Sequence, residues 1–182
     1  MEELIDIVDK NGEPTGETAL KSVIHSKGYY HNTAHIWFYA SDRKILLSQR
    51  AASKTICPLL WDVSVAGHVD AGETIEQAAI RETKEELGIT IKGFDLKKIG
   101  VYPCFQLYDN GIKDNEFHHT FIAKLSAKVE SIQFDFNEVE AIKLVSISEF
   151  KALLKLSETN SHFVASNKTY YYNVLSCIEN EL

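Results

Sequence analysis

Apolar residues along the chain fall into short runs that alternate with polar positions or are bounded by turn residues. Five of these runs are rich in aliphatic, β-branched and aromatic side chains and are predicted to be strands: residues 4–9, 34–40, 44–50, 61–67 and 139–146. Asn11-Gly12 is a strong turn signal after the first run. Residues 96–109 and 115–125 flank Asn110-Gly111 and predict a hairpin, and the connection 41–44 suits a second one.

Helical patterns are found in three places. Thr74 with Gln77 is typical of a capping box and Gly88 of a C-cap, so a helix is predicted between them. Two further helices are predicted over residues 146–156 and 169–180. Because strands joined by hairpins are mixed with helices, the sequence predicts an α+β fold with a mixed β-sheet rather than a doubly wound parallel sheet.

Composition narrows the class of protein. The chain has 182 residues, 45% of them hydrophobic. This favours one domain over residues 1–182, with a core at about 30–165 and an appended N-terminal strand and C-terminal helix. The net charge of −7 and the absence of a basic stripe argue against a nucleic-acid polymer as partner. No apolar run approaches the length of a membrane span, and the first ten residues lack the apolar core of a signal peptide.

The cysteines bear on location. Cys57, Cys104 and Cys177 are an odd number without a CxxC spacing, which is typical of reduced thiols inside a cell. We therefore expect a cytoplasmic protein. The tyrosine run 170–172 on the last predicted helix is interpreted as a packing surface or as a contact between the copies of a homodimer.

Residues 67–89 read GHVDAGETIEQAAIRETKEELGI and place three carboxylates on one helical face. Glu82 lies three positions before Glu85 and four before Glu86, so the three side chains are neighbours. Arg81 is spaced to pair with Glu85, and a divalent cation would offset the remaining repulsion. The plain alternative is an exposed helix with a charged face, which is common.

The segment resembles the Nudix box, whose pattern is G-x5-E-x7-R-E-U-x-E-E-x-G-U with U an aliphatic residue. The matching residues are Gly67, Glu73, Arg81, Glu82, Glu85, Glu86, Gly88 and Ile89. Thr83 departs from the pattern, because an aliphatic residue is usual there. So many fixed positions in one short frame make the match far more specific than a lone glycine motif.

This resemblance implies a Nudix fold, with a mixed sheet between helices, and a hydrolase that cleaves a diphosphate linkage in a small molecule using Mg²⁺ or Mn²⁺. Hard cations held by carboxylates would neutralise phosphate oxygens and activate the attacking water. Glu82 and Glu86, followed by Glu85, are the expected metal ligands. Arg81 is expected to orient a carboxylate, and Glu73 to hold the loop to the helix.

Residues 15–38, 48–68 and 114–121 extend the resemblance to isopentenyl-diphosphate isomerase and the Nudix hydrolases most similar to it. In the isomerase a second metal site uses histidines and acids from these segments. The residues in matching places here are His25, His31, His68, Asp114 and Glu116. His35 is an alternative to His31, because the spacing from His25 to His31 differs by one residue.

The same resemblance implies roles in substrate binding and catalysis. Arg50 and Lys54 match positions that hold the diphosphate, and His68 is a further candidate for substrate contact. Glu116 joins Glu85, Glu86 and Arg81 in the expected catalytic set. His118 and His119 are interpreted as surface or structural residues.

Ala66 separates this chain from the isomerase, which has its catalytic cysteine immediately before the box glycine. A methyl group cannot transfer a proton, and none of the three cysteines stands where it clearly restores the thiol. The sequence therefore favours hydrolysis of a nucleoside diphosphate derivative or of an isoprenoid or other organic diphosphate. An isomerase and a module that senses a diphosphate without cleaving it are the alternatives.

Overall fold

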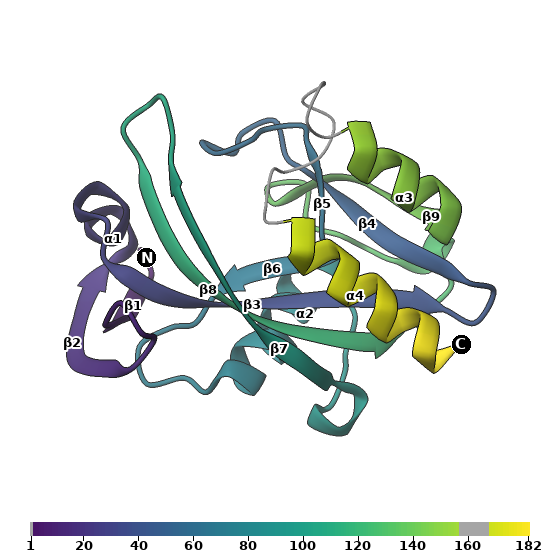
Figure 1. Cartoon of the computed structure of the whole chain (residues 1–182), viewed down its shortest axis with the longest axis horizontal. Helices are drawn as coiled ribbons and strands as arrows, with labels where there is room; N and C mark the ends of the chain where they lie inside the picture. Colours follow the sequence, from purple (N-terminus) through teal and green to yellow (C-terminus); the bar gives the residue numbers. More distant parts are fainter. Residues whose placement is uncertain (1, 157–167) are drawn as a thin grey trace.

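The computed structural model describes residues 2–156 and 168–182, which fold as a mixed sheet with helices on both faces (Figure 1). The elements are β1 Leu4–Val8, β2 Pro14–Leu20, α1 Lys21–Lys27, β3 Tyr30–Ala40, β4 Lys44–Arg50, β5 Trp61–Asp62, β6 Val65–His68, α2 Ile75–Leu87, β7 Lys97–Leu107, β8 Lys113–Lys124, β9 Val139–Ser146, α3 Ile147–Leu156 and α4 Lys168–Glu181. Single 3₁₀ turns lie at Gly93–Asp95 and Val129–Ser131. The α+β fold with a mixed sheet between helices is confirmed.

Strand β3 is the centre of the sheet. It pairs antiparallel with β4 and β6 and parallel with β8. β8 forms the predicted antiparallel hairpin with β7, and β4 carries β5 and β9. β1 and β2 extend the sheet at the beginning of β3. The strands beside β3 therefore bring residues from distant parts of the sequence next to the N-terminal half of β3.

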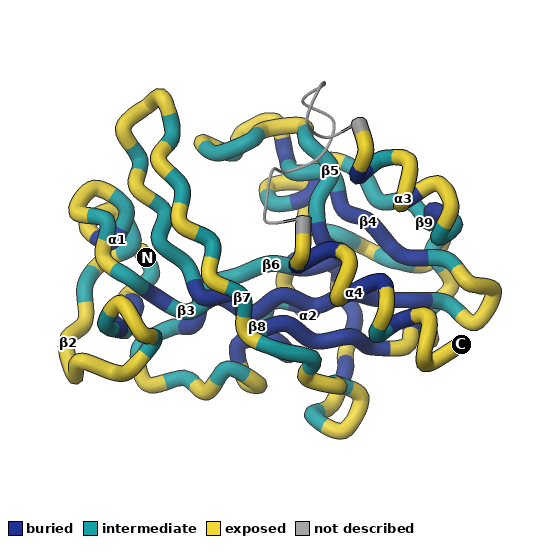
Figure 2. The backbone as a smooth tube through the Cα atoms, viewed as in Figure 1, coloured by how far each residue is buried: buried dark blue, intermediate teal, exposed yellow. Residues whose placement is uncertain are grey.

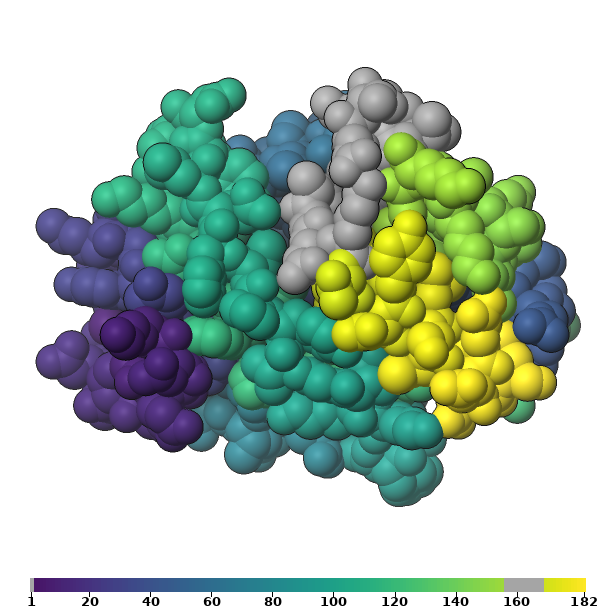
Figure 3. Space-filling view, viewed as in Figure 1, coloured from purple at the N-terminus to yellow at the C-terminus, as the bar shows by residue number. Residues whose placement is uncertain are grey.

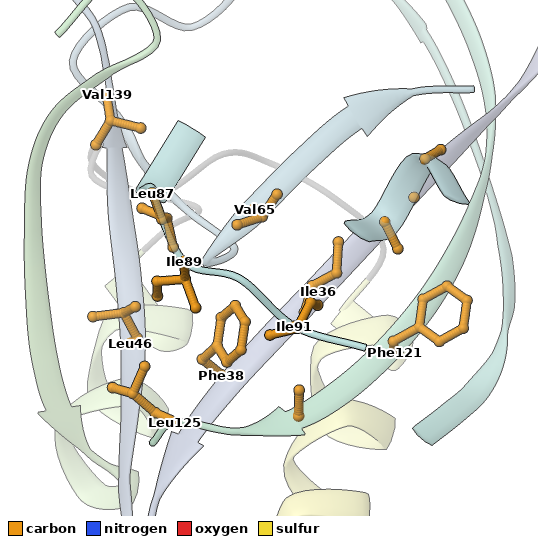
Figure 4. Packing of buried hydrophobic residues seen from close by; sticks show 14 of the residues in the cluster. Ile36, Phe38, Leu46, Val65, Leu87, Ile89, Ile91, Phe121, Leu125 and Val139 are labelled. Atoms are coloured by element: carbon orange, nitrogen blue, oxygen red, sulfur yellow. The ribbon is translucent and has the colours of Figure 1, made fainter. Parts of the chain in front are cut away.

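Side chains of β3 alternate between two cores, as the period of a strand requires. Ile36 and Phe38 belong to the core under α2, together with Leu87 and Val65 (Figure 4). Trp37 and Tyr39 point to the other face and pack under α3 and α4. One strand thus holds both helical layers, and its central residues are buried (Figure 2).

Helix α2 begins and ends as predicted. Thr74 Oγ accepts from the Gln77 amide at 3.2 Å, and Gln77 Oε1 accepts from the Thr74 amide at 2.9 Å. Gly88 follows the helix with a φ of 66°, which a residue without a Cβ adopts at little cost. Thr83 is buried, and its hydroxyl donates to the Ala79 carbonyl at 2.7 Å. The departure from the box pattern is therefore accommodated inside the helix.

Two expectations differ from the structure. The single strand over 61–67 is wrong, because β5 pairs with β4 whereas β6 pairs with β3. Ser64 lies at the change of partner, where its hydroxyl accepts from the Phe38 amide at 2.9 Å and donates to the Leu46 carbonyl at 2.6 Å. β2 and α1 were not predicted, because β2 is exposed along its length and lacks an apolar alternation.

The expected end of the core at about residue 165 lies outside the described residues. In the part of the chain that the structure describes, no helix is long and apolar enough to cross a membrane.

Candidate functional site

A cavity of about 770 Å³ lies among α1, α2, β3, β6, the β7–β8 hairpin and the start of α4. Ten carboxylate side chains line it, against four lysine or arginine side chains. A cavity of this volume suits a small molecule. Its excess of negative charge would repel an anionic ligand unless cations were also bound.

Arg81 joins helix α2 to the loop before it. Its Nε and Nη2 donate to the two carboxylate oxygens of Glu73 at 3.1 and 2.8 Å, and Nη2 also donates to the His68 carbonyl at 2.9 Å. Nη1 donates to Glu82 at 2.7 Å and to Glu85 at 3.1 Å. The expected tie between Glu73 and the helix is present, and Arg81 is occupied by the protein's own acceptors.

Two carboxylates of α2 lie near each other, Glu86 buried and Glu82 partly buried. Burial, opposed by Arg81, raises the pKa of Glu82 to about 7. Burial and then the charge of Glu82 raise the pKa of Glu86 well above its ordinary value. Glu82 reaches this place because Gly67 has no side chain: a Cβ at Gly67 would lie 2.0 Å from Glu82 Cδ. A divalent cation would favour the charged form of both acids.

Glu85 differs from these two, because 58% of its side chain is exposed. Among the described residues, three groups have potential ligand atoms within 4.8 Å of one another, and each contains a histidine. They are His25, His31 and His68; His31, Asp114 and Glu116; and His35, Glu116 and His118. The box carboxylates are not in these groups.

The five residues of the expected second metal site do come together. His25 Nε2 lies 3.3 Å from Asp114 Oδ1, and Glu116 Oε1 lies 3.6 Å from His31 Nε2 and 3.9 Å from His68 Nε2. The three Nε2 atoms and Asp114 Oδ1 are buried and have no hydrogen-bond partner. Buried polar atoms are rarely left unpaired.

This donor set fits a metal ion. Ligands bound at about 2.1 Å around one ion lie about 3 to 3.5 Å from one another, which is close to these separations. Imidazole nitrogens and carboxylate oxygens are ordinary ligands of divalent transition metals. The alternative ligand, His35, is grouped with Glu116 and His118 but not with His25, His68 or Asp114, and its Nδ1 is 2.9 Å from the Tyr170 hydroxyl. The structure therefore groups His31, not His35, with the other four residues.

Residues 29–166 of the chain match the NUDIX domain family. The chain belongs to the Nudix family. It is 36% identical over 157 residues to a Nudix hydrolase of Clostridium acetobutylicum, covering 84% of this chain and 74% of that protein. It is 34% identical over 154 residues to isopentenyl-diphosphate Delta-isomerase 2 of Photorhabdus laumondii, covering 85% of this chain and 83% of the isomerase.

Among solved structures, a protein of Deinococcus radiodurans matches with a TM-score of 0.68 and 19% identity, covering 88% of this chain and 93% of that one. This likeness supports the fold alone. The chain spans 20% of the length of another relative, Nudix hydrolase 3 of Arabidopsis thaliana. The chain is thus a Nudix hydrolase by family, from the part of the family that resembles the isomerase.

Sequence reasoning missed His118 as a residue of this Nudix site. His118 Nε2 lies 2.7 Å from Glu116 Oε2, and its ring stacks on His35 at 3.9 Å between centroids. Although burial by itself lowers it, the pKa of His118 is raised to about 10 by contacts with Cys104 and Glu116. The interpretation of His118 as a structural residue agrees with its burial and its bond to Glu116, and its side chain also lines the cavity. The alternation of β8, which puts His118 on the same face as Glu116, was the available signal.

The cations near the diphosphate-binding positions have partners within the protein. Arg50 donates to the Ile56 carbonyl at 2.9 Å and lies 3.4 Å from Asp62, while Lys54 pairs with Glu138. Both cations thus pair with the protein's own acids in this structure. Both side chains still line the cavity. Contact with a phosphate would therefore require these ion pairs to open.

Ala66 lines the cavity between β3 and the box, as does Cys104 from β7. The expectation that no cysteine is placed to restore a thiol is thus incomplete: Cys104 faces the cavity from another strand, next to His118. Its position opposite Glu116 in the β7–β8 register follows from the hairpin and not from the box.

Replacing Gly67 by Ala is expected to destabilise the protein by about 1 to 3 kcal/mol, because the added methyl overlaps Glu82. Denaturant unfolding measures the change. In a Glu82→Ala background the same substitution should cost much less, since the obstacle is gone. An equal cost in both backgrounds would show that Glu82 does not require the glycine.

Proposed function

We propose that this Nudix protein hydrolyses a diphosphate linkage in a small molecule and that Mg²⁺ or Mn²⁺ is required. The observation that carries the proposal is the cavity itself: clustered carboxylates and unpaired histidine nitrogens lie in the same space as Arg50 and Lys54. Such a space suits an anionic substrate only together with bound cations. The products would be two molecules that each carry one of the separated phosphate groups.

Two groups of residues would hold the cations. Glu82 and Glu86, with Glu85 at the exposed edge, supply oxygen ligands of the kind that Mg²⁺ prefers. The second group is His25, His31, His68, Asp114 and Glu116. Its nitrogen atoms favour a transition-metal ion such as Mn²⁺ over Mg²⁺. When bound, these ions supply charge neutralisation at phosphate oxygens and lower the pKa of a coordinated water.

The chain's own residues position the reactants. Arg81 does not reach the substrate in this proposal; it holds Glu82 and the loop so that the carboxylates keep their places. Arg50 and Lys54 exchange Asp62 and Glu138 for phosphate oxygens. Charge-assisted contacts of this kind are strong and directional. Phosphoryl transfer depends mostly on such positioning and on electrostatic stabilisation.

The substrate class is proposed from the chemistry of the site and from its relatives. One relative is named for an isoprenoid diphosphate and others are named only as Nudix hydrolases. Candidates are therefore nucleoside diphosphate derivatives and isoprenoid or other organic diphosphates. A panel of such compounds, with the phosphorylated products of hydrolysis quantified for each, ranks them. Binding of one compound without turnover would instead favour the sensing module.

Replacing Glu86 by Gln should lower turnover about a hundredfold or more, as losing one preorganised electrostatic contact in a transition state does. The shape is kept while the charge that would bind a cation is removed. Turnover at saturating Mg²⁺ and at saturating Mn²⁺ is measured on the best substrate of the panel. Glu76→Gln, on the same helix but outside the cavity, is the matched control. Near wild-type turnover in Glu86→Gln would refute the assignment.

Arg50→Ala and Lys54→Ala should each lower kcat/KM about ten- to a hundredfold, the loss expected for one charge-assisted contact worth about 1.5 to 3 kcal/mol. Lys54→Ala should leave the thermal midpoint within a few degrees of wild type, since its ion pair is partly exposed. Unchanged kinetics in both variants would remove them from the substrate site.

An isomerase is the second candidate, favoured by the histidine cluster and by the isomerase relative. Ala66 argues against it, so we predict no conversion of isopentenyl diphosphate to its dimethylallyl isomer. Incubation in heavy water with detection of deuterium in the product is the measurement. Deuterated product formed in proportion to the protein would overturn this prediction, and its loss in Cys104→Ala would then locate the thiol.

A further inference from the structure

The N-terminal residues reach the cavity from outside the NUDIX match, which begins at residue 29. Glu3, Lys21 and His25 all line it. Residues 3–28, here the N-terminal unit, comprise β1, β2 and α1 around a small core of its own. Figure 3 shows the purple N-terminal residues at one end of the molecule. Because His25 is one of the clustered histidines, this unit already contributes to the site.

The backbone at Glu3 is held on both sides. The Glu3 carbonyl accepts from the Lys21 amide at 3.0 Å, and the Leu4 carbonyl accepts from the Ala71 amide, within the box loop, at 2.8 Å. The side chain is held as well: Lys21 Nζ donates to Glu3 Oε1 at 2.9 Å. The carboxylate therefore occupies a defined place beside the loop that carries His68.

The second carboxylate oxygen, Glu3 Oε2, is buried and lies 3.3 Å from His68 Nδ1, an ion-pair distance, with no hydrogen-bond partner in the present geometry. The other ring nitrogen of His68, Nε2, is buried, faces Glu116 Oε1 at 3.9 Å and has no hydrogen-bond partner. His31 offers a comparison: its Nδ1 makes a hydrogen bond of 3.1 Å with the Tyr29 carbonyl, and its Nε2 is unpaired. In both rings an acceptor faces Nδ1 while Nε2 points into the cluster.

We propose that Glu3 is a positioning residue that keeps the proton of His68 on Nδ1 and leaves Nε2 as a bare ligand atom facing the cluster. The N-terminal unit is then a working part of the metal site, and Lys21 orients the carboxylate. An acceptor at one ring nitrogen determines the tautomer of a histidine and orients its ring toward a metal. This proposal rests on the proposed function insofar as it assigns a metal to the histidine cluster.

Removing Glu3 should leave both His68 tautomers accessible and the ring free to turn, at a cost of about 10- to 100-fold in metal affinity. Co²⁺ is the probe, since its visible absorption reports nitrogen ligands, and it is titrated into the full chain after chelator treatment. Glu3→Ala should bind Co²⁺ about 10- to 100-fold more weakly, and Glu3→Gln, which retains an acceptor oxygen, should recover part of the loss.

Glu2→Ala is the matched control. Glu2 is the neighbouring glutamate, and its carboxylate accepts from the Ser22 amide of α1 at 2.8 Å but does not line the cavity. Its variant should bind Co²⁺ like wild type. Affinity of Glu3→Ala within twofold of wild type, or an equal loss in Glu2→Ala, would overturn the proposal.

A second measurement separates this proposal from the assignment of the metal. Long-range nitrogen–proton NMR spectra of the metal-free protein report which nitrogen of His68 carries the proton. Wild type should show the Nδ1–H form, and Glu3→Ala a mixture or the Nε2–H form. An unchanged tautomer would refute the role of Glu3. Failure of wild type to bind Co²⁺ would refute the metal assignment, while the tautomer would still decide the role of Glu3.

Discussion

The guanidinium of Arg81 is the joint on which the site depends. It donates hydrogen bonds to Glu73 and the His68 carbonyl, which precede the helix, and to Glu82 on the helix. These bonds hold the two segments together. Bidentate pairing of arginine with a carboxylate specifies geometry as well as energy. Gly67 lets the helix approach the strand end closely enough for this joint to form. The box loop in turn receives the N-terminal strand through Ala71.

These hydrogen bonds of Arg81 allow like charges to be kept together in a site that is largely shielded from water. Glu86 is buried and Glu82 is partly buried, and burial raises the pKa of both. A protein selected for stability alone would not keep such groups, because uncompensated buried charge is costly. The rest of the fold tolerates them because two separate apolar cores lie on either face of β3. The proposed cation binding would account for the carboxylates, and packing elsewhere accounts for the stability of the fold that carries them.

The histidine cluster shows a different principle of construction. Its residues come from α1, β3, β6 and β8, and no two of the three histidines belong to one element. The parallel pairing of β3 with β8 places His31 directly beside Glu116 in the register. Each of the two rings on β3 and β6 has an acceptor behind it, from Tyr29 and Glu3. The cluster is thus assembled by sheet topology rather than by local sequence.

The sequence by itself determined the capped helix, the spacing of its carboxylates, the β7–β8 hairpin and the mixed class of the fold. These features are local, since periodicity, caps and turns act over a few residues. Only the tertiary structure decided the partner change at Ser64, the choice of His31, the entry of Glu3 into the cavity, and the ion pairs of Arg50 and Lys54. Each depends on which strands become neighbours and on which atoms burial leaves unpaired. Such relations join residues far apart in the chain, so a local pattern carries no record of them.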